Sequence, residues 1–401
     1  MRIPFLIPDI TQAEVDAVSE TLMSGWITTG PAVRQFESEL AHFMGTGAVA
    51  CTSSATAALE CALRLLGIGP GDEVITTPYT YTASCSVIVH VGARPVLVDT
   101  AADSLEMDYE RLYDAITPNT KAIIPVDVGG IMCDYDTIFS VVERHRQIFQ
   151  PRNDIQEAMG RIAVIADAAH SVGATYHGRP SGSVGDFSAF SFHAVKNLTT
   201  GEGGALTWRE IPGFDDAEIF RRVQLLILHG QSKSALDKTN LGTWEYDIVD
   251  TNFKWNMTDI AASIGIVQLH RYPEMLARRK AILERYRDSI DGDIAKLTLH
   301  YTDEGSSSGH LAIVRLHGFD ADGRNAFIEE MASHEVVCNV HYKPLPLMTA
   351  YRKLGMRPED YPEAIAFYEN EVTLPLHTKL TDEEVDYVIE SFHDSYRKCG
   401  A

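Results

Sequence analysis

The sequence predicts an α/β protein, with a large domain built on a mostly parallel sheet between helices and a smaller α+β domain at the C-terminus. From about residue 47, short apolar runs alternate with runs of helical periodicity, and several apolar runs have no polar face. Strands that are apolar on both faces are typical of a parallel sheet covered by helices. This alternation stops near residue 250, and 401 residues are too many for one core. We therefore expect domains at residues 1–250 and 251–401.

The first 30 residues are expected to form an N-terminal arm that contains one helix. Thr11 and Glu14 have the spacing of a capping box, in which each side chain hydrogen-bonds the backbone N–H of the other residue. Gly and Pro in residues 24–31 end this helix, and a second helix is expected at 32–44. Strands of the large domain are predicted at 48–51, 73–76, 95–98, 121–126, 161–166, 187–192 and 204–208. Helices are predicted at 57–66, 79–91 and 135–146, with an irregular segment at 147–160.

The C-terminal domain is expected to mix helices and strands without regular alternation. Ile260, Ile264 and Val267 lie on one face of a helix predicted at 257–269. A separate, highly charged helix is predicted at 273–290. Further strands are predicted at 296–301, 310–316 and 336–340, and further helices at 323–334 and 382–397.

Composition argues against several classes of protein. The net charge is −22, and an acidic surface repels phosphates, so we expect no binding to nucleic acid. The six cysteines lack Cys-x-x-Cys spacing, which argues against a metal site or a disulfide framework and favours a reducing compartment. The N-terminus does not resemble a signal peptide, and no apolar run has the length of a membrane span. We therefore expect a cytoplasmic protein that binds no membrane.

A single lysine, Lys196, follows the apolar strand predicted at 187–192 and precedes a turn rich in Thr and Gly. A lysine at a sheet edge that is partly desolvated has a lowered pKa, and its neutral amine can attack a carbonyl to form a Schiff base. The alternative is an ordinary lysine in a solvated hairpin turn, since most lysines are exposed.

Two other strand ends carry candidate cofactor-binding groups. Residues 53–56 open a helix, whose free N–H groups and dipole favour a phosphate, although a simple Ser/Thr cap is the alternative. Asp167 ends a buried strand, where a carboxylate needs hydrogen-bond donors or a cation, so a structural ion pair would also explain it. A carboxylate on a protonated pyridine nitrogen and a Schiff-base lysine are both devices of pyridoxal phosphate (PLP) enzymes. The three features together favour PLP.

Seven ordered motifs resemble the DegT/DnrJ/EryC1/StrS family of PLP-dependent sugar aminotransferases, which have the aspartate aminotransferase-like fold (fold type I). The lysine motif is Ser-Phe-His-Ala-Val-Lys-Asn-Leu-Thr-Thr-Gly-Glu-Gly-Gly at residues 191–204. The other matching stretches are 25–31, 53–59, 69–75, 167–170, 253–260 and 374–376. The resemblance covers nearly the whole chain and implies that the cofactor is PLP.

The resemblance implies a role for each matching residue. Lys196 would form the Schiff base with PLP and move a proton during amino transfer. Asp167 would keep the pyridine nitrogen protonated, and His170 would hydrogen-bond the phenolic oxygen. Tyr81 would stack on the cofactor, unless it is an aromatic residue that faces the core. The groups expected to bind the phosphate are the backbone N–H groups of Ala55 and Thr56 and the hydroxyl of Ser191.

Residues 253–260 resemble the segment that reaches into the active site of the partner subunit in this family. Many relatives have Asn at the position of Lys254 and Arg at that of Asn256, so which of the two meets the partner's phosphate is open. A solvated pair at the start of a helix is the other interpretation. The resemblance implies a homodimer with shared active sites.

The expected reaction moves an amino group from an amino acid, with glutamate as first choice, to a keto group of a nucleotide-linked deoxysugar by a ping-pong mechanism. A 4-keto sugar is the first choice of acceptor, although residues 126–134 lack the His/Tyr and Gly-Gln-Pro that are commoner in this loop. Two alternatives are a sugar dehydratase of the same family and a catalytically silent regulatory or binding protein. Lys196 argues against the dehydratases, which have histidine there, and intact Asp167 and Ser191 argue against lost catalysis.

Overall fold

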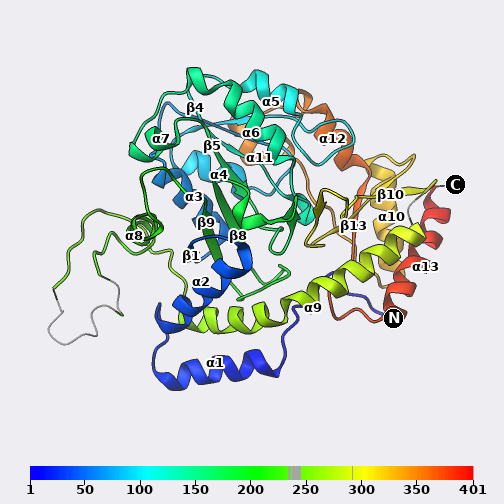
Figure 1. The fold of residues 1–401 in the computed structure, drawn as a ribbon. Coiled ribbons are helices and arrows are strands. Elements are labelled where there is room, and N and C mark those ends of the chain that lie inside the picture. Colours follow the sequence, from blue (N-terminus) through cyan, green and yellow to red (C-terminus); the bar gives the residue numbers. More distant parts are fainter. Residues whose placement is uncertain (234–235, 237–244, 291, 401) are drawn as a thin grey trace.

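The computed structural model describes residues 1–233, 236, 245–290 and 292–400, and its largest element is a seven-stranded sheet at the centre of Figure 1. The strands of this main sheet are β1 (Val49–Thr52), β2 (Glu73–Thr76), β3 (Arg94–Leu97), β4 (Thr120–Ile124), β5 (Ala163–Asp167), β8 (Phe187–Ser191) and β9 (Gly204–Trp208). Their order is β1-β9-β8-β5-β4-β2-β3. β9 is antiparallel to β1 and β8, and the other neighbours are parallel. The predicted α/β class with a mostly parallel sheet is confirmed.

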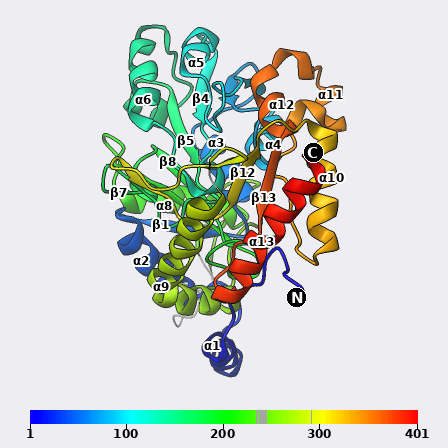
Figure 2. The ribbon, with the colours of Figure 1, turned by 90° about the vertical axis from the view of Figure 1, so that its right-hand side faces the viewer.

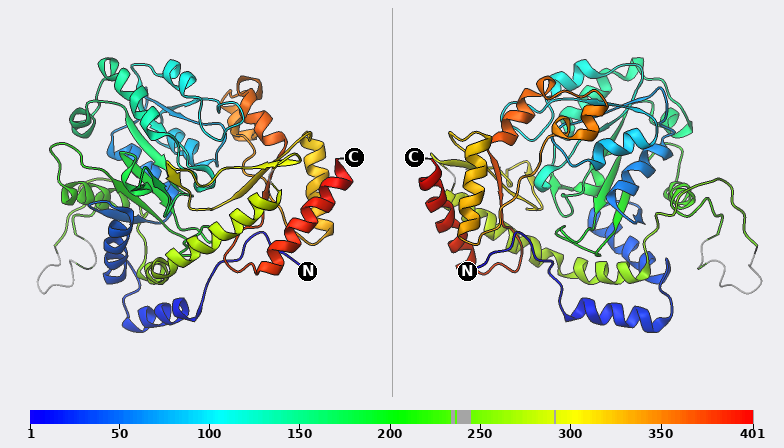
Figure 3. Two further views of the ribbon diagram at one scale, coloured as in Figure 1. Left: turned by 45° about the vertical axis from the view of Figure 1, so that its right-hand side comes forward. Right: turned by 180° about the vertical axis from the view of Figure 1, so that it is seen from behind.

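Helices cover both faces of the main sheet, as the two views of Figure 3 show. Those in the first 230 residues are α1 (Gln12–Ser24), α2 (Pro31–Met44), α3 (Ala55–Leu65), α4 (Ala83–His90), α5 (Tyr109–Ala115), α6 (Tyr135–Arg144), α7 (Asp154–Met159) and α8 (Asp216–Ile227). The side chains of β5 point alternately to the two faces of the main sheet and pack into different cores. Val164 and Ala166 belong to the core that includes α2 and α6, and Ala163 and Ile165 to the core that includes α3, α4 and α8. Burial on both faces explains the continuous apolar runs.

A second sheet and its helices form another core in the C-terminal part. Its antiparallel strands, in the order β10-β12-β13, are β10 (Ala295–Leu297), β12 (Ala312–Leu316) and β13 (Glu371–Leu374). The helices here are α9 (Asp259–Ile290), α10 (Ala321–Ser333), α11 (Thr349–Lys353), α12 (Pro362–Glu369) and α13 (Asp382–Cys399). Figure 2 shows α10 and α13 beside this sheet. The predicted division into domains at residue 250 stays a prediction.

Several short elements complete the fold. A third sheet has the order β11-β6-β7, with β6 (Thr175–Tyr176), β7 (Arg179–Pro180) and β11 (Gly305–Ser306). Turns of 3₁₀ helix are found at Val128–Gly130, Arg146–Ile148, Ser181–Ser183, Leu345–Leu347 and Pro358–Asp360. Within the described ranges, no helix combines the length and the apolar character needed to cross a bilayer.

Helix α9 is a single helix of 32 residues, so the prediction of two helices that meet at Pro273 is wrong. A proline inside a helix removes one backbone hydrogen bond and crowds the preceding turn. Here both halves of α9 are anchored by burial. Leu269 and Tyr272 pack into the core of the main sheet, and Ile282 and Tyr286 pack into the C-terminal core. These tertiary contacts keep the helix continuous through the proline.

Three further local predictions need correction. Residues 147–160 are not irregular throughout, because Asn153 caps helix α7 by accepting a hydrogen bond from the N–H of Gln156 at 3.0 Å. The segment 336–340 forms isolated bridges to Ile3 and Thr373 rather than a regular strand. Helix α4 begins at Ala83 and not at residue 79, because the backbone N–H of Tyr79 donates to the hydroxyl of Thr77 at 3.1 Å and its buried hydroxyl donates to the backbone oxygen of His341 at 2.9 Å.

Asp259, the first residue of α9, also caps the start of α2. Its Oδ1 accepts hydrogen bonds from the N–H groups of Gly30 (2.7 Å) and Val33 (3.0 Å), and its Oδ2 accepts one from Ala32 (3.1 Å). Asp259 is buried, so Asp259→Ala would leave three N–H groups without their hydrogen-bond acceptor. We expect this variant to lower the free energy of unfolding by about 3 kcal/mol, measured by urea unfolding.

The matched control for this variant is Asp320→Ala at the start of α10. Asp320 is exposed, and its side chain accepts a hydrogen bond from the N–H of Gly323 at 2.8 Å. The expected loss is about 1 kcal/mol. Equal losses in the two variants would show that the buried cap is no more important than an ordinary one.

Candidate active site

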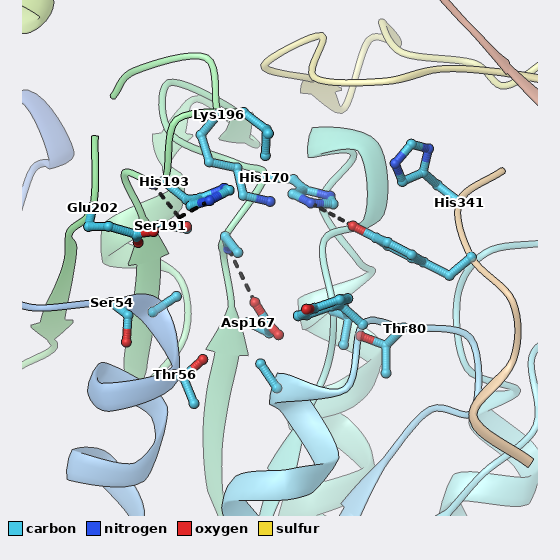
Figure 4. A pocket seen from close by; sticks show the side chains of 17 residues that line it. Ser54, Thr56, Thr80, Asp167, His170, Ser191, His193, Lys196, Glu202 and His341 are labelled. Atoms are coloured by element: carbon cyan, nitrogen blue, oxygen red, sulfur yellow. Dashed lines mark hydrogen bonds and ion pairs between the residues drawn. The ribbon is translucent and has the colours of Figure 1, made fainter. Parts of the chain in front are cut away.

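A cavity of about 380 Å³ lies at the carboxyl ends of the parallel strands. This is where ligands bind in open α/β sheets, and the volume is within the usual range for small-molecule sites. Figure 4 shows Lys196 and Asp167 facing the cavity, with the start of α3 below them. The predicted site residues that line it are Ala55, Thr56, Tyr81, Asp167, His170, Ser191 and Lys196.

Lys196 lies in the turn between β8 and β9, and its side chain enters the cavity. Burial lowers the pKa of this lysine to about 8, and the negative charge of Asp167 opposes the shift. In the described part of the chain, no carboxylate lies within ion-pair distance of its amine. Lys196 is only partly exposed and lines the cavity, so it is not a solvated hairpin lysine. An amine with this pKa is substantially neutral at slightly alkaline pH and can act as a nucleophile.

Asp167 ends β5 and is almost fully buried. Its Oδ2 accepts a hydrogen bond from the hydroxyl of Ser84 at 2.6 Å, and its Oδ1 accepts one from the N–H of Ala169 at 3.2 Å. Burial raises the pKa of this carboxyl, while the two donors and the charge of Lys196 lower it. No cation among the described residues forms an ion pair with Asp167, so the structural ion pair is not observed. A buried carboxylate without a counterion at a cavity wall fits a protonated ring nitrogen.

The start of α3 provides the features of a phosphate site. Ser54 caps the helix by accepting a hydrogen bond from the N–H of Ala57 at 3.1 Å. The N–H groups of Ala55 and Thr56 make no hydrogen bond within the described chain and adjoin the cavity. Gly204 is required here, because a Cβ atom on it would lie 2.5 Å from the nitrogen of Ala55. Free N–H groups at a helix start favour a bound phosphate, so the residues fit this part of PLP as well.

Hydrogen bonds to Gly129 and Tyr342 fix the orientation of the His170 ring, and Tyr342 was not among the predicted site residues. Nδ1 of His170 accepts a hydrogen bond from the N–H of Gly129 at 3.1 Å, so Nε2 carries the hydrogen and donates to the hydroxyl of Tyr342 at 3.0 Å. Gly129 has a φ of 68°, which favours glycine. Burial, followed by the charge of Lys196, keeps the pKa of His170 well below its usual range. Its bond to a phenolic oxygen stays a prediction.

Tyr81 is 62% exposed at the cavity, which excludes the interpretation that it faces the core. Its ring centroid lies 6.2 Å from that of Tyr342. The role of Tyr81 in stacking on the cofactor stays a prediction. Ser191, at the end of β8, is buried against the same cavity.

Lys254 and Asn256 do not line this cavity. The exposed amine of Lys254 donates a hydrogen bond to Oδ1 of Asn256. Nδ2 of Asn256 donates to the hydroxyl of Thr29 at 2.5 Å, and the backbone of Asn256 pairs with that of Thr52 at the end of β1. The segment is thus anchored to the main sheet, with the lysine at the surface. Contact with a second subunit stays a prediction for both residues.

Sequence reasoning missed Ser84, His341 and Tyr342. A signal for Ser84 did exist, because it follows Tyr81 by one helical turn and would share its face in the helix predicted at 79–91. No comparable signal marks His341 and Tyr342, which reach the cavity from the segment before α11.

Fold and cavity together define a PLP-dependent transferase of fold type I. The α/β layers place a desolvated lysine opposite a strand-end carboxylate, and the helix start beside them suits a phosphate. More narrowly, the chain belongs to the DegT/DnrJ/EryC1/StrS aminotransferase family, whose model matches residues 8–393.

Individual relatives agree with this membership. The putative sugar aminotransferase Spr1654 from Streptococcus pneumoniae, solved in a PMP form, is 55% identical, with a TM-score of 0.97 over 99% of this chain and 100% of that one. Its PLP form is 53% identical, with a TM-score of 0.96 over the full length of both chains. The spore coat polysaccharide biosynthesis protein SpsC of Bacillus subtilis (strain 168) is 38% identical over 98% of this chain and 96% of that protein. The family and the PLP form of Spr1654 show that PLP is the cofactor.

Proposed function

We propose that this protein transfers an amino group from an amino acid, with glutamate as first choice, to a keto group of a nucleotide-linked deoxysugar. A 4-keto sugar is the first choice of acceptor. The observation that carries the proposal is Lys196, whose desolvated amine shares one cavity with Asp167. The names of relatives support a sugar as acceptor, since one acts in spore coat polysaccharide biosynthesis and another, PseC of Helicobacter pylori, in pseudoaminic acid biosynthesis. A cytoplasmic location is part of the proposal.

Each cavity residue has a distinct task in this reaction. PLP, when bound, supplies an electron sink for the carbon that loses its proton. Lys196 would hold the cofactor through its amine, and the same amine would carry a proton between donor and acceptor atoms. Asp167 retains the ring nitrogen as a cation, because two neutral donors keep its carboxylate oriented toward the cavity. The N–H groups of Ala55 and Thr56 and the hydroxyl of Ser191 bind the phosphate.

We also propose that the active protein is a homodimer with shared sites. No arginine is among the described residues that line the cavity, and the chain has a net charge of −22. A phosphate and an anionic donor therefore lack a strong cation within one subunit. The exposed amine of Lys254 would supply this cation to the cavity of a second copy. The neutral amide of Asn256 is the weaker candidate for the same contact.

The test is a screen of nucleotide keto-sugars with ¹⁵N-labelled glutamate, with products identified by mass spectrometry and NMR. Transfer of the label to a sugar carbon would support the proposal, and Lys196→Ala should abolish it. The two alternatives give other products. A dehydratase would remove water from the sugar without incorporating nitrogen, and a silent binding protein would return every sugar unchanged.

A further inference from the structure

Glu371, the first residue of β13, is a fully buried carboxyl outside the site described so far. Its Oε2 accepts a hydrogen bond from the backbone N–H of His341 at 2.9 Å, and its Oε1 lies 2.5 Å from the hydroxyl oxygen of Thr373. The nearby Arg324 donates to the backbone oxygen of Glu371 at 3.0 Å rather than to its carboxylate. In the part of the chain that the structure describes, this carboxylate has no ion-pair partner.

The hydroxyl of Thr373 links Glu371 to the ring of His341. It lies 2.9 Å from Nδ1 of that ring, so the hydroxyl can donate to one of these two neighbours and accept from the other. The backbone holds this geometry in place. The N–H of Asn339 donates to the oxygen of Thr373 at 3.0 Å, and the N–H of Thr373 donates to the oxygen of Asn339 at 2.8 Å. The bridge between Asn339 and Thr373 therefore holds the segment that carries His341 beside β13.

His341 lines two neighbouring cavities. Lys196 and Tyr342 also line both of them. One is the cavity described above, and the other has a volume of about 150 Å³. Phe5 stacks on the His341 ring, with centroids 5.6 Å apart and planes 22° from parallel. Since Nδ1 is turned to Thr373, Nε2 is the ring nitrogen left for a ligand, and it has no hydrogen-bond partner among the described residues. Burial and the charge of Lys196 lower the pKa of His341 to about 4, so the imidazole is neutral.

Two hydrogen-bond arrangements satisfy this chain of groups. If Glu371 is ionised, Thr373 donates to it, Nδ1 of His341 donates to Thr373, and Nε2 presents a lone pair. If Glu371 is protonated, its hydrogen is donated to Thr373, which donates to Nδ1, and the ring hydrogen is on Nε2. The arrangements differ by one proton in total, and the imidazole is neutral in both.

We propose that His341, Thr373 and Glu371 form a proton relay that opens into the active-site cavity at Nε2 of His341. When Nε2 takes up a proton, the Nδ1 hydrogen passes to Thr373 and the hydroxyl hydrogen passes to Glu371. Release at Nε2 reverses each transfer, and no group is oxidised or reduced. Thr373 and Glu371 are positioning residues that act through His341.

Both arrangements are accessible near neutral pH. Burial raises the pKa of Glu371 to about 8, opposed by its donors Thr373 and His341 and by the charge of Arg324. Other titratable or charged groups also face Glu371 from the packed elements. They are Arg315 of β12, which is its cross-strand neighbour, and Tyr79, Cys338 and Tyr342.

The relay would serve the proposed reaction, on which this step rests. Conversion of a ketone to an amine expels the carbonyl oxygen as water, and that oxygen needs a proton donor. Nε2 of His341 can supply the proton from the cavity wall beside Lys196, and Glu371 then regains its negative charge. Because the ring is neutral before and after, the relay adds no cation next to the amine of Lys196.

The relay is tested by ¹⁵N NMR of the histidine-labelled holoenzyme between about pH 6 and pH 10, with the His341 signals assigned by their loss in His341→Gln. We expect the ring hydrogen to move from Nε2 to Nδ1 as the pH rises through about 8. Thr373→Val removes the hydroxyl and keeps the branched shape, so the change with pH should vanish. Thr373→Ser should restore it. A wild-type tautomer that is constant over this range would overturn the proposal, as would an unaltered titration in Thr373→Val.

Glu371→Gln gives a second test, in which Thr373 is left unchanged. The amide donates to Thr373 and accepts from the N–H of His341, so we expect the hydrogen to stay on Nε2 at every pH. A tautomer that still changes would contradict the relay. These NMR measurements need no substrate, so their outcome is separate from that of the sugar screen. With an accepted sugar in hand, kcat/KM of Thr373→Val should fall by about tenfold or more and Thr373→Ser should recover most of the loss.

Discussion

Lys196→Ala is expected to lower kcat by at least about 10³-fold, because it removes the nucleophile and the proton carrier together. The variant should also lose the visible absorption that arises when PLP is bound covalently to lysine. Both effects are measured on purified protein supplied with PLP, by amino transfer from glutamate and by absorbance. A variant that retains full activity in the glutamate half-reaction would overturn the assignment of Lys196.

Lys353→Ala is the matched control, since it removes the same charge from an exposed position in α11. It should have wild-type activity and absorbance. The pH dependence of the wild-type protein gives a second check. Because the pKa of Lys196 is lowered to about 8, its amine is protonated as the pH falls below that value, so covalent binding of PLP should slow on the acid side.

Asp167→Ala is expected to lower kcat by about 10²- to 10³-fold and to weaken retention of PLP, because the ring nitrogen would lose its buried anion. Ser84→Ala provides a graded comparison, since it keeps the carboxylate and removes its donor at 2.6 Å. The expected loss in kcat for this variant is on the order of tenfold. The two variants are compared by steady-state kinetics and by the PLP content after dialysis.

The sign of the pH effect in Ser84→Ala follows from the same hydrogen bond. Burial raises the pKa of Asp167, and the hydroxyl of Ser84 is the largest of the contributions that lower it. Loss of that hydroxyl raises the pKa of Asp167 further. The acid limb of the pH–activity profile should therefore lie at a higher pH in Ser84→Ala than in the wild-type protein. A Ser84→Ala profile shifted to lower pH would contradict the orientation of the carboxylate.

Much of the main sheet could be predicted because its strands carry a strong local signal. Apolar runs such as β5, buried on both faces, cannot be mistaken for surface segments, and their ends mark the ligand-binding edge. The break predicted at Pro273 failed for the opposite reason. A proline weakens a helix locally, but α9 is stabilised by two cores that the local sequence does not describe. The segment 336–340 likewise depends on partners far away in the chain.

Site residues that directly follow strands could be predicted, whereas those placed by distant segments could not. Lys196 and Asp167 follow strands directly, so their position could be predicted from the strand pattern. His341 reaches the cavity from a segment more than a hundred residues further on, and its neighbour Glu371 looks like an ordinary charged residue in the sequence. Burial raises the pKa of the Glu371 carboxyl, and this burial arises only when the chain folds.

Helix α9 also links the two main cores mechanically. Its two halves are built into different cores, so it is a rod that ties them together, in addition to the direct packing of Ile313 of β12 against Tyr79 and Val126. The backbone oxygen of Leu269 receives no helical hydrogen bond from Pro273, which makes this turn the softest point of the rod. The proline that does not end the helix is therefore the place where α9 resists bending least.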